Sequence, residues 1–118
     1  MSESILREKA KDFAKNIVFL TKEIKSTKKE FVLSNQLLRS GTSIGANVYE
    51  AQYAQSSADF ISKLEISLKE CYESEYWLQL LFETGYLDEK KYKTLISDCG
   101  LIRKLLISSC KTLKNNFD

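Results

Sequence analysis

The chain has 118 residues, of which 43% are apolar and 29% charged, and its formal net charge is +2. This length predicts one domain over residues 1–118, with a core that needs no disulfide or metal, and the composition excludes wholesale disorder. Apolar runs fall short of the roughly 18–20 residues of a membrane span, and the charged N-terminus does not fit a signal peptide. We therefore expect a cytoplasmic protein without membrane association.

The first predicted helix covers about residues 4–25. Its apolar positions recur at steps of three and four, which places them on one helical face. They are Leu6, Ala10, Phe13, Ile17, Leu20 and Ile24. The chain contains no proline, as suits long helices joined by short turns.

The second predicted helix covers about residues 28–53. It begins at a capping box, in which Thr27 accepts from a free backbone N–H and Glu30 reaches back. Its apolar series is less regular and consists of Leu33, Leu37, Ser40, Ile44, Val48 and Ala51. Gly41 and Gly45 each weaken this helix by ~1 kcal/mol relative to alanine.

The third predicted helix, about residues 57–84, has the cleanest periodicity. Its inward positions alternate by four and three: Phe60, Leu64, Ser67, Cys71, Ser74, Leu78 and Leu81. Either Ser56 together with Asp59, or Ser57 itself, caps its first turn. Gly85 supplies the left-handed residue that ends it.

The fourth predicted helix covers about residues 89–114 and follows a cap at Asp88. Its inward series is Tyr92, Leu95, Cys99, Ile102, Leu106, Ser109 and Leu113. Because connections of a few residues force sequential helices to be antiparallel neighbours, the predicted fold class is all-α. The architecture is an antiparallel up-down-up-down four-helix bundle.

The sequence lacks most of the residue patterns that carry catalysis or metal binding. Without histidine the chain lacks the commonest general base and metal ligand, as well as the Glu-x-x-His pairs of di-iron bundles. Cys71, Cys99 and Cys110 lack metal-ligand spacing and are interpreted as small buried side chains with reduced thiols. Glu70 and Glu73 are placed on the solvent side of the third helix. We therefore predict no enzyme activity, no cofactor, no metal and no small-molecule substrate.

Charge is unevenly distributed along the chain. The net charge is +2 in residues 1–26, +1 in 27–55, −4 in 56–84 and +3 in 85–118. Three arrangements would account for this distribution. The acidic and basic faces meet between subunits, they pair within one bundle, or the basic helices bind a polyanion. The candidate nucleic-acid contacts on the first and fourth helices are Lys9, Lys11, Lys15, Lys22, Lys90, Lys91, Arg103, Lys104 and Lys111.

Several apolar side chains point away from the predicted core, which favours homo-oligomerisation. The candidates for a subunit interface are Val18, Phe19, Tyr49, Tyr53, Tyr72, Tyr76 and Trp77. Leu101 and Ile107 also face outward on the fourth helix. Base stacking on Tyr72 or Tyr76 is disfavoured, because the surrounding acidic helix repels phosphates.

A polar stripe runs along the second helix and consists of Arg39, Ser43, Asn47 and Glu50. Arg39 and Glu50 are about 16 Å apart along the helix axis, too far to pair with each other. Each must find a partner on another helix, in another subunit or in solvent.

The stripe carries a family resemblance. Residues 36–40 read Gln-Leu-Leu-Arg-Ser, and residues 43–50 read Ser-Ile-Gly-Ala-Asn-Val-Tyr-Glu. They resemble the signature of 23S rRNA-intervening sequence proteins: Gln-x-x-Arg-Ser, then Ser-Ile-x-x-Asn and an acidic-Gly pair. Further matches are Phe60, Lys63 to Ser67, Glu73 to Glu75, Leu78 and the turn at Gly85 to Leu87. Ala51 replaces the usual glycine, and Gly45 stands where proline is common, which bears on how the second helix ends.

The resemblance covers about residues 6–113 and implies a bacterial four-helix-bundle protein whose molecular role is unassigned. The family is similar to the accessory proteins of diversity-generating retroelements, which form pentameric rings and bind a reverse transcriptase and nucleic acid. By that similarity the chain is a homopentamer, and its basic helices bind RNA or a protein–RNA complex. The alternative is a protein-interaction scaffold, which docks a partner polypeptide through the exposed aromatic side chains without nucleic acid.

Overall fold

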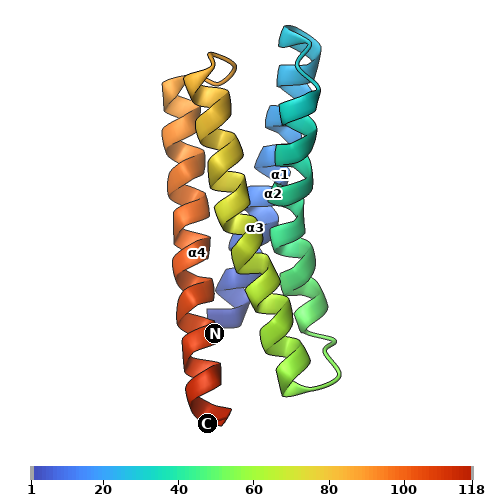
Figure 1. Ribbon diagram of the computed structural model, residues 1–118, viewed down its shortest axis with the longest axis vertical. Helices are drawn as coiled ribbons and strands as arrows, with labels where there is room; N and C mark the ends of the chain where they lie inside the picture. The colour runs from blue at the N-terminus through green and yellow to red at the C-terminus, as the bar shows by residue number, and fades with distance from the viewer. Residues whose placement is uncertain (1, 118) are drawn as a thin grey trace.

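The computed structural model describes residues 2–117, and the side chains of residues 5–115, as four helices and three short connections. The helices are α1 (Ser2–Lys28), α2 (Val32–Ala51), α3 (Ser57–Glu83) and α4 (Glu89–Phe117). They run antiparallel in chain order, and the α1–α2 and α3–α4 connections lie at the same end of the molecule (Figure 1). The predicted all-α, antiparallel four-helix bundle is confirmed.

The four helices form a square in cross-section. Each helix packs closely against two neighbours, in the cyclic order α1, α2, α3, α4, and within residues 2–117 the backbones of diagonal helices stay farther apart. The resulting bundle is elongated, with extents of 49 × 22 × 20 Å. Four lateral faces are therefore available: α1–α2, α2–α3, α3–α4 and α4–α1.

The core follows the predicted periodicity closely. Every inward position predicted for the first helix is buried, and Phe13 and Ile17 are among the largest side chains that are fully enclosed. On the other helices Leu33, Phe60, Tyr92, Ser109 and Leu113 are half-buried, whereas the remaining predicted positions are buried. The stripe positions thus converge on one apolar centre.

The connection between α1 and α2 differs from the prediction at Thr27. Thr27 lies inside α1 and donates its hydroxyl to the Glu23 carbonyl, so it does not cap α2. The carboxylate of Glu30 instead accepts the backbone N–H groups of Leu33 (2.9 Å) and Ser34 (2.8 Å). A carboxylate satisfies two N–H groups and also suits the positive end of the helix dipole. This cap moves the start of α2 from the predicted residue 28 to Val32.

The remaining predicted caps are confirmed. Ser56 accepts from the backbone N–H of Asp59, whose carboxylate accepts in return from that of Gln55. Gly85 adopts a φ of 87° directly after α3, a conformation that other residues rarely adopt. Asp88 accepts from the backbone N–H of Lys91 at the start of α4.

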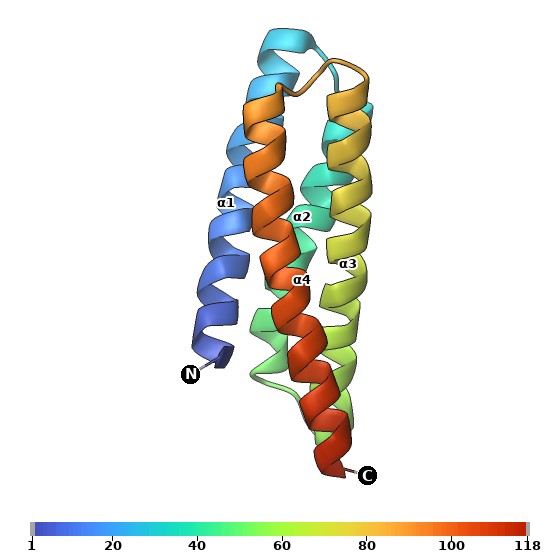
Figure 2. The same cartoon turned by 90° about the vertical axis from the view of Figure 1, so that its left-hand side faces the viewer.

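Both glycines of α2 lie where α1 approaches closely. A Cβ at Gly41 would lie 3.0 Å from side-chain atoms of Ile17, and one at Gly45 would lie 3.4 Å from the carbonyl oxygen of Ala10. α2 is continuous through both positions and ends at Ala51, before the predicted residue 53. The glycines therefore bring α1 and α2 together, whereas α1 and α4 diverge toward the chain termini (Figure 2).

Candidate functional site

The polar stripe of α2 is tied to α3. The guanidinium of Arg39 donates to Glu70 (3.1 Å) through one nitrogen and to Glu73 through the other. Glu73 also accepts from the indole N–H of Trp77 at 3.0 Å. The partner that the sequence left open for Arg39 is therefore within the same chain.

The other residues of the stripe serve the α2–α3 contact or the helix itself. Glu50 forms an ion pair with Lys63 of α3 at 3.3 Å. Ser43 donates to the carbonyl of Arg39, and Asn47 donates to the carbonyl of Ser43. None of these contacts resembles a catalytic arrangement: the ion pair of Glu50 joins α2 to α3, and the bonds of Ser43 and Asn47 lie within α2.

Two positions predicted to be solvent-facing are not. Glu70 is buried, with a relative exposure of 8%, and Glu73 is half-buried, because both carboxylates turn toward Arg39. Trp77, predicted to point outward, is also half-buried and packs against the core. Its indole lies on the α2 side of α3 and is oriented by the hydrogen bond to Glu73.

The acidic side chains of α3 are also paired with α4. Arg103 donates to the carboxylate of Glu75 at 3.0 Å and lies 5.8 Å from the ring centre of Tyr72. The bond to Glu75 raises the pKa of Arg103. Lys114 forms an ion pair with Glu65 at 2.6 Å. Together with the Arg39 pairs, these contacts account for four of the six acidic residues in 56–84.

The charged side chains of α1 differ between the flank that faces α2 and the flank that faces α4. Arg7 donates to Gln52 of α2 at 2.6 Å, which identifies the α2 side of α1. Glu23 pairs with Lys91 of α4 at 3.0 Å, which identifies the α4 side. The helical repeat places Lys11, Lys22 and Lys25 on the side of Arg7, with Lys15 at its outer edge. The same repeat places Asp12 and Lys9 on the side of Glu23, and Glu8 at the outward edge near Lys15.

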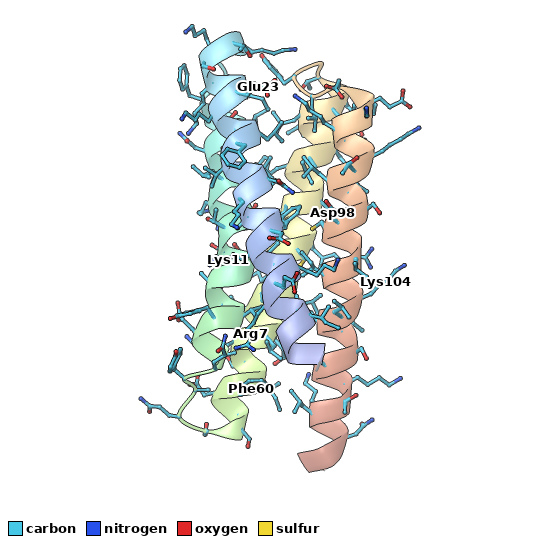
Figure 3. All side chains as sticks on the ribbon, turned by 180° about the vertical axis from the view of Figure 1, so that it is seen from behind. Arg7, Lys11, Glu23, Phe60, Asp98 and Lys104 are labelled. Carbon is cyan, nitrogen blue, oxygen red and sulfur yellow. The ribbon has the colours of Figure 1, made fainter. Side chains whose placement is uncertain are left out.

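The basic side chains of α1 and α4 do not form one stripe. On α4 the exposed Lys104 and Lys111 share the outward face, to which Lys93, not singled out from sequence, also belongs, whereas Lys90 lines a depression between α1 and α4. Asp98 lies between α1 and α4, while Lys11 and Lys104 lie on opposite flanks (Figure 3). The groove between the two helices therefore contains acidic side chains, together with Lys90 and Lys91. It separates two basic strips, one with Arg7 and Lys11 on α1 and one with Lys104 and Lys111 on α4.

Two of the nine candidate contacts are held within the bundle. Lys91 pairs with Glu23, which raises the pKa of Lys91, and Arg103 pairs with Glu75. The other seven lysines are exposed and form no ion pair with a side chain that the structure describes: Lys9, Lys11, Lys15, Lys22, Lys90, Lys104 and Lys111. Arg7 was not among the nucleic-acid contacts predicted from sequence, although it precedes Lys11 by one helical turn.

Apart from Trp77, the candidate interface side chains are exposed, and they lie on several faces. Tyr72 is on the α3–α4 face beside Arg103, and Tyr76 follows it one turn later. Phe19 lines a depression of about 470 Å³ between α1 and α4. The remaining exposed candidates are Val18, Tyr49 and Tyr53, and the outward Leu101 and Ile107 are exposed as well.

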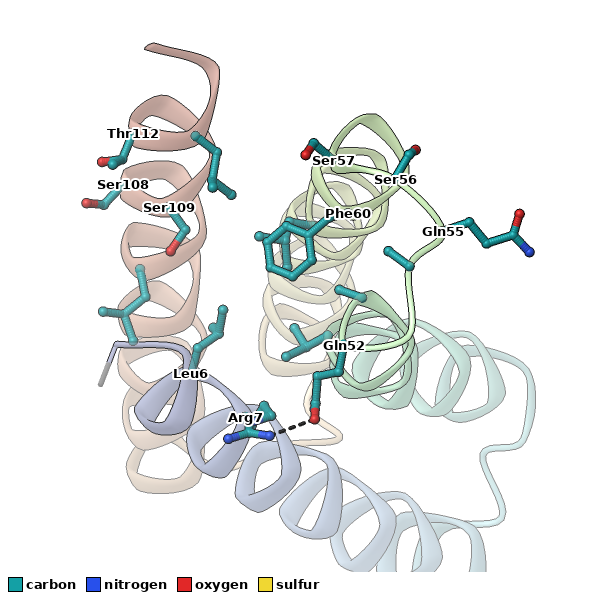
Figure 4. A pocket seen from close by; sticks show the side chains of 16 residues that line it. Leu6, Arg7, Gln52, Gln55, Ser56, Ser57, Phe60, Ser108, Ser109 and Thr112 are labelled. Atoms are coloured by element: carbon teal, nitrogen blue, oxygen red, sulfur yellow. Dashed lines mark hydrogen bonds between the residues drawn. The ribbon is translucent and has the colours of Figure 1, made fainter. Parts of the chain in front are cut away.

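A cleft of about 770 Å³ opens where α1 and α4 diverge. Phe60 points into it, the Arg7–Gln52 bond borders one side, and Ser108, Ser109 and Thr112 of α4 border the other (Figure 4). The walls carry no acidic side chain and no arrangement of a nucleophile with a base. The cleft offers space for a ligand but no evident chemistry.

The three cysteines are buried and free, as predicted. Contact with Cys71, followed by burial, raises the pKa of Cys99, and burial raises the pKa of Cys110. Such thiols are unreactive. Within residues 2–117 no cluster of acidic and cysteine side chains could hold a metal ion, and no helix combines the length and apolarity needed to cross a membrane.

Comparison with known proteins identifies the relatives of this bundle. The 23S rRNA-intervening sequence protein family matches residues 2–108. The chain belongs to this family. A crystal structure of a Bacteroides thetaiotaomicron protein, described as of unknown function and from the S23 ribosomal protein family, is 51% identical and has a TM-score of 0.92. The match covers 94% of this chain and 99% of that one.

The family assignment confirms the resemblance that began at the polar stripe. No protein with curated annotation matches the chain, so the comparisons give no activity or ligand to transfer. The family's signature residues Arg39 and Glu50 lie at the α2–α3 contact, where they form ion pairs with α3. In this chain that part of the signature therefore has a structural role.

Proposed function

We propose that this family member is a non-catalytic, cytoplasmic bacterial protein that assembles into a ring and binds RNA or a protein–RNA complex. The observation that carries the proposal is the distribution of charge. The acidic side chains of α3 are largely paired with α2 and α4, whereas seven lysines of α1 and α4 remain exposed without an ion pair to a described side chain. A surface of unpaired cations attracts phosphates and contributes counterion release.

Assembly strengthens this attraction. Exposed apolar side chains on different faces, such as Tyr72 on α3–α4 and Phe19 on α1–α4, suit a heterologous contact, in which one face of a subunit meets another face of the next. Such contacts close into rings when the rotation allows it. The number of five subunits follows the similarity to retroelement accessory proteins. Five subunits of net charge +2 would together carry +10 and offer repeated, multivalent contacts.

The test begins with the mass in solution by light scattering coupled to size exclusion. A pentamer of 13.6 kDa subunits has a mass of about 68 kDa. Binding of a structured RNA is then measured against salt, and the logarithm of the affinity should fall linearly, with a slope of about −0.9 per phosphate contact. A monomer, or an oligomer that binds no RNA at low ionic strength, would refute the proposal.

A matched pair of variants locates the interface. Lys104→Glu/Lys111→Glu reverses two unpaired charges on the outward face of α4 and should weaken RNA binding by about 10-fold or more. Lys29→Glu/Lys69→Glu makes the same change in net charge away from both basic strips. Equal losses in the two variants would indicate attraction by net charge alone, without an interface on α4.

The second candidate function is a protein-interaction scaffold. It is favoured by Tyr72 and Tyr76, which lie on a face where Arg103 and Lys114 are already paired with α3. Large amphipathic rings of this kind are enriched at protein interfaces. Replacing both tyrosines should then abolish partner capture, whereas reversal of the unpaired lysines should leave it intact.

A further inference from the structure

The face formed by α1 and α2 combines cations with exposed aromatic rings. From α1 it receives Arg7, Lys11 and Lys22, and from α2 it receives Tyr49 and Tyr53. Tyr49 follows Gly45 by four residues and precedes Gln52 by three, and both of these contact α1, so its ring lies on the α1 side of α2. Arg7 and Lys11 lie on the flank of α1 next to α2 (Figure 3).

The two tyrosine rings are fixed relative to each other and remain open to solvent. Their centres are 5.6 Å apart with a tilt of 50°, and they are 62% and 68% exposed. Tyr53 lies beyond the end of α2, where its backbone N–H donates to the Glu50 carbonyl at 3.0 Å. Arg7 donates to Gln52, the residue directly before Tyr53, at 2.6 Å, which places Arg7 close to the ring pair.

Repulsion of phosphate is low on this face. Among the side chains that the structure describes, Asp12 and Glu23 of α1 turn toward α4, Glu8 lies at the outward edge of α1, Glu50 pairs with Lys63, and Glu30 caps α2. The surroundings of Tyr49 and Tyr53 therefore differ from those of Tyr72 and Tyr76, which stand beside the acidic residues of α3. A basic surface with aromatic platforms and few acidic side chains is the arrangement used by proteins that bind single-stranded nucleic acid.

We propose that the α1–α2 face binds a single-stranded polynucleotide, with bases stacked on Tyr49 and Tyr53 and phosphates on Arg7, Lys11 and Lys22. The inference rests on the proposed RNA-binding function and assigns it a substrate class and a site. Arg7 and Lys22 are about 22 Å apart along α1, the length of roughly six stacked nucleotides at ~3.4 Å each. Duplexes have no free base faces, so the tyrosines contribute only to the binding of single strands.

The test uses a fluorescent oligouridylate of about twelve nucleotides, twice the predicted site, and a hairpin duplex of equal charge. Tyr49→Leu/Tyr53→Leu keeps an apolar side chain but removes the ring. It should weaken oligouridylate binding by about 10-fold or more, and hairpin binding by less than about twofold. An oligodeoxyuridylate of equal length shows whether the ribose 2′-hydroxyl contributes, since both strands offer the same phosphates and bases.

The matched control is Tyr72→Leu/Tyr76→Leu, which removes an exposed pair with the same spacing from the opposite face. It should leave the affinity for oligouridylate within about twofold of the original. Lys11→Glu/Lys22→Glu should weaken single-strand and hairpin binding together and reduce the salt slope, because it removes phosphate contacts.

The outcomes separate the two proposals. If the unaltered protein binds neither probe at low ionic strength, the RNA-binding function itself fails. If it binds RNA but Tyr49→Leu/Tyr53→Leu has no effect, or the control pair has an equal effect, only the single-strand site is overturned. A changed subunit number in Tyr49→Leu/Tyr53→Leu would assign these rings to a subunit contact and would also overturn the site.

Discussion

The α2–α3 pair and the α4–α1 pair are the two extremes of packing in this bundle. Between α2 and α3 the contact is made by small hydroxyl side chains: Ser74 donates to Ser40 at 2.9 Å, and Ser67 donates to the Ile44 carbonyl at 2.8 Å. Between α4 and α1 the helices diverge and leave a cleft of about 770 Å³. Small buried residues allow close helix approach, whereas the open pair leaves surface for ligands or for other subunits.

The largest expected effect comes from enlarging a side chain in the closed pair. Ser74→Leu places a larger group where Ser40 and α2 leave no space, and it leaves the Ser40 hydroxyl without this partner. We expect a loss of about 2–4 kcal/mol in the free energy of unfolding, measured by urea denaturation. Ser109→Leu, the same change on the wall of the open cleft, should cost less than about 1 kcal/mol. Equal losses would mean that the cleft is as tightly packed as the α2–α3 contact.

A smaller effect is expected from the ion pairs of the two regions. Arg39→Met leaves the buried Glu70 carboxylate without its cation, and because Arg39 itself is half-exposed we expect a loss of about 1–2 kcal/mol. Lys91→Met breaks the exposed pair with Glu23 between α4 and α1 and should cost at most about 0.5 kcal/mol. Thermal and urea unfolding measure both losses.

A double variant checks the cause of the Arg39 effect. Arg39→Met/Glu70→Leu removes the buried charge together with its partner, so stability should recover most of the loss. A double variant as unstable as Arg39→Met alone would show that the stem of Arg39, and not its charge, is what α2 and α3 require.

An effect smaller than that of Arg39 concerns the cap that sets where α2 begins and hence its register against α3. Partial burial raises the pKa of Glu30, but hydrogen bonds from Leu33 and Ser34 outweigh it and hold this pKa below its ordinary value. The carboxylate therefore stabilises the fold above the unfolded-state pKa of about 4.3, and this contribution is lost as pH falls through the lowered folded-state pKa. Glu30→Gln should cost about 0.5–1 kcal/mol at pH 7 and progressively less below pH 4.3. A difference that does not change with pH would exclude the charge of Glu30 as its source.

Prediction from sequence succeeded where one helix carries the information and failed where two helices share it. The 3.6-residue period identifies buried positions such as Phe13 and Leu78, since a residue's side of its own helix depends only on spacing. The positions of Glu70, Glu73 and Trp77 were wrong because their environment is set by Arg39, thirty or more residues away. Thr27 was wrong because a competing cap, Glu30, satisfies two N–H groups of α2 at once.

The candidate sites divide in the same way. The exposure of Tyr49, Tyr53, Tyr72 and Tyr76 was predicted from the helical period of each helix. Sequence could not reveal that the first pair lies near Arg7 whereas the second stands beside Arg103, because the rotation of each helix about its axis is set by packing against its neighbours.

The amino-acid sequence alone determined the helices, their antiparallel order, the core positions and the family, because these depend on local spacing, short turns and motif residues. Only the tertiary structure decided which charges are neutralised and which remain exposed. It separated the basic strips of α1 and α4 by a groove that contains acidic side chains and brought Tyr49 and Tyr53 to the basic side of α1. The reason is that electrostatic interactions depend on distances across helices, and these are fixed by close packing at residues such as Gly45 and Ser74.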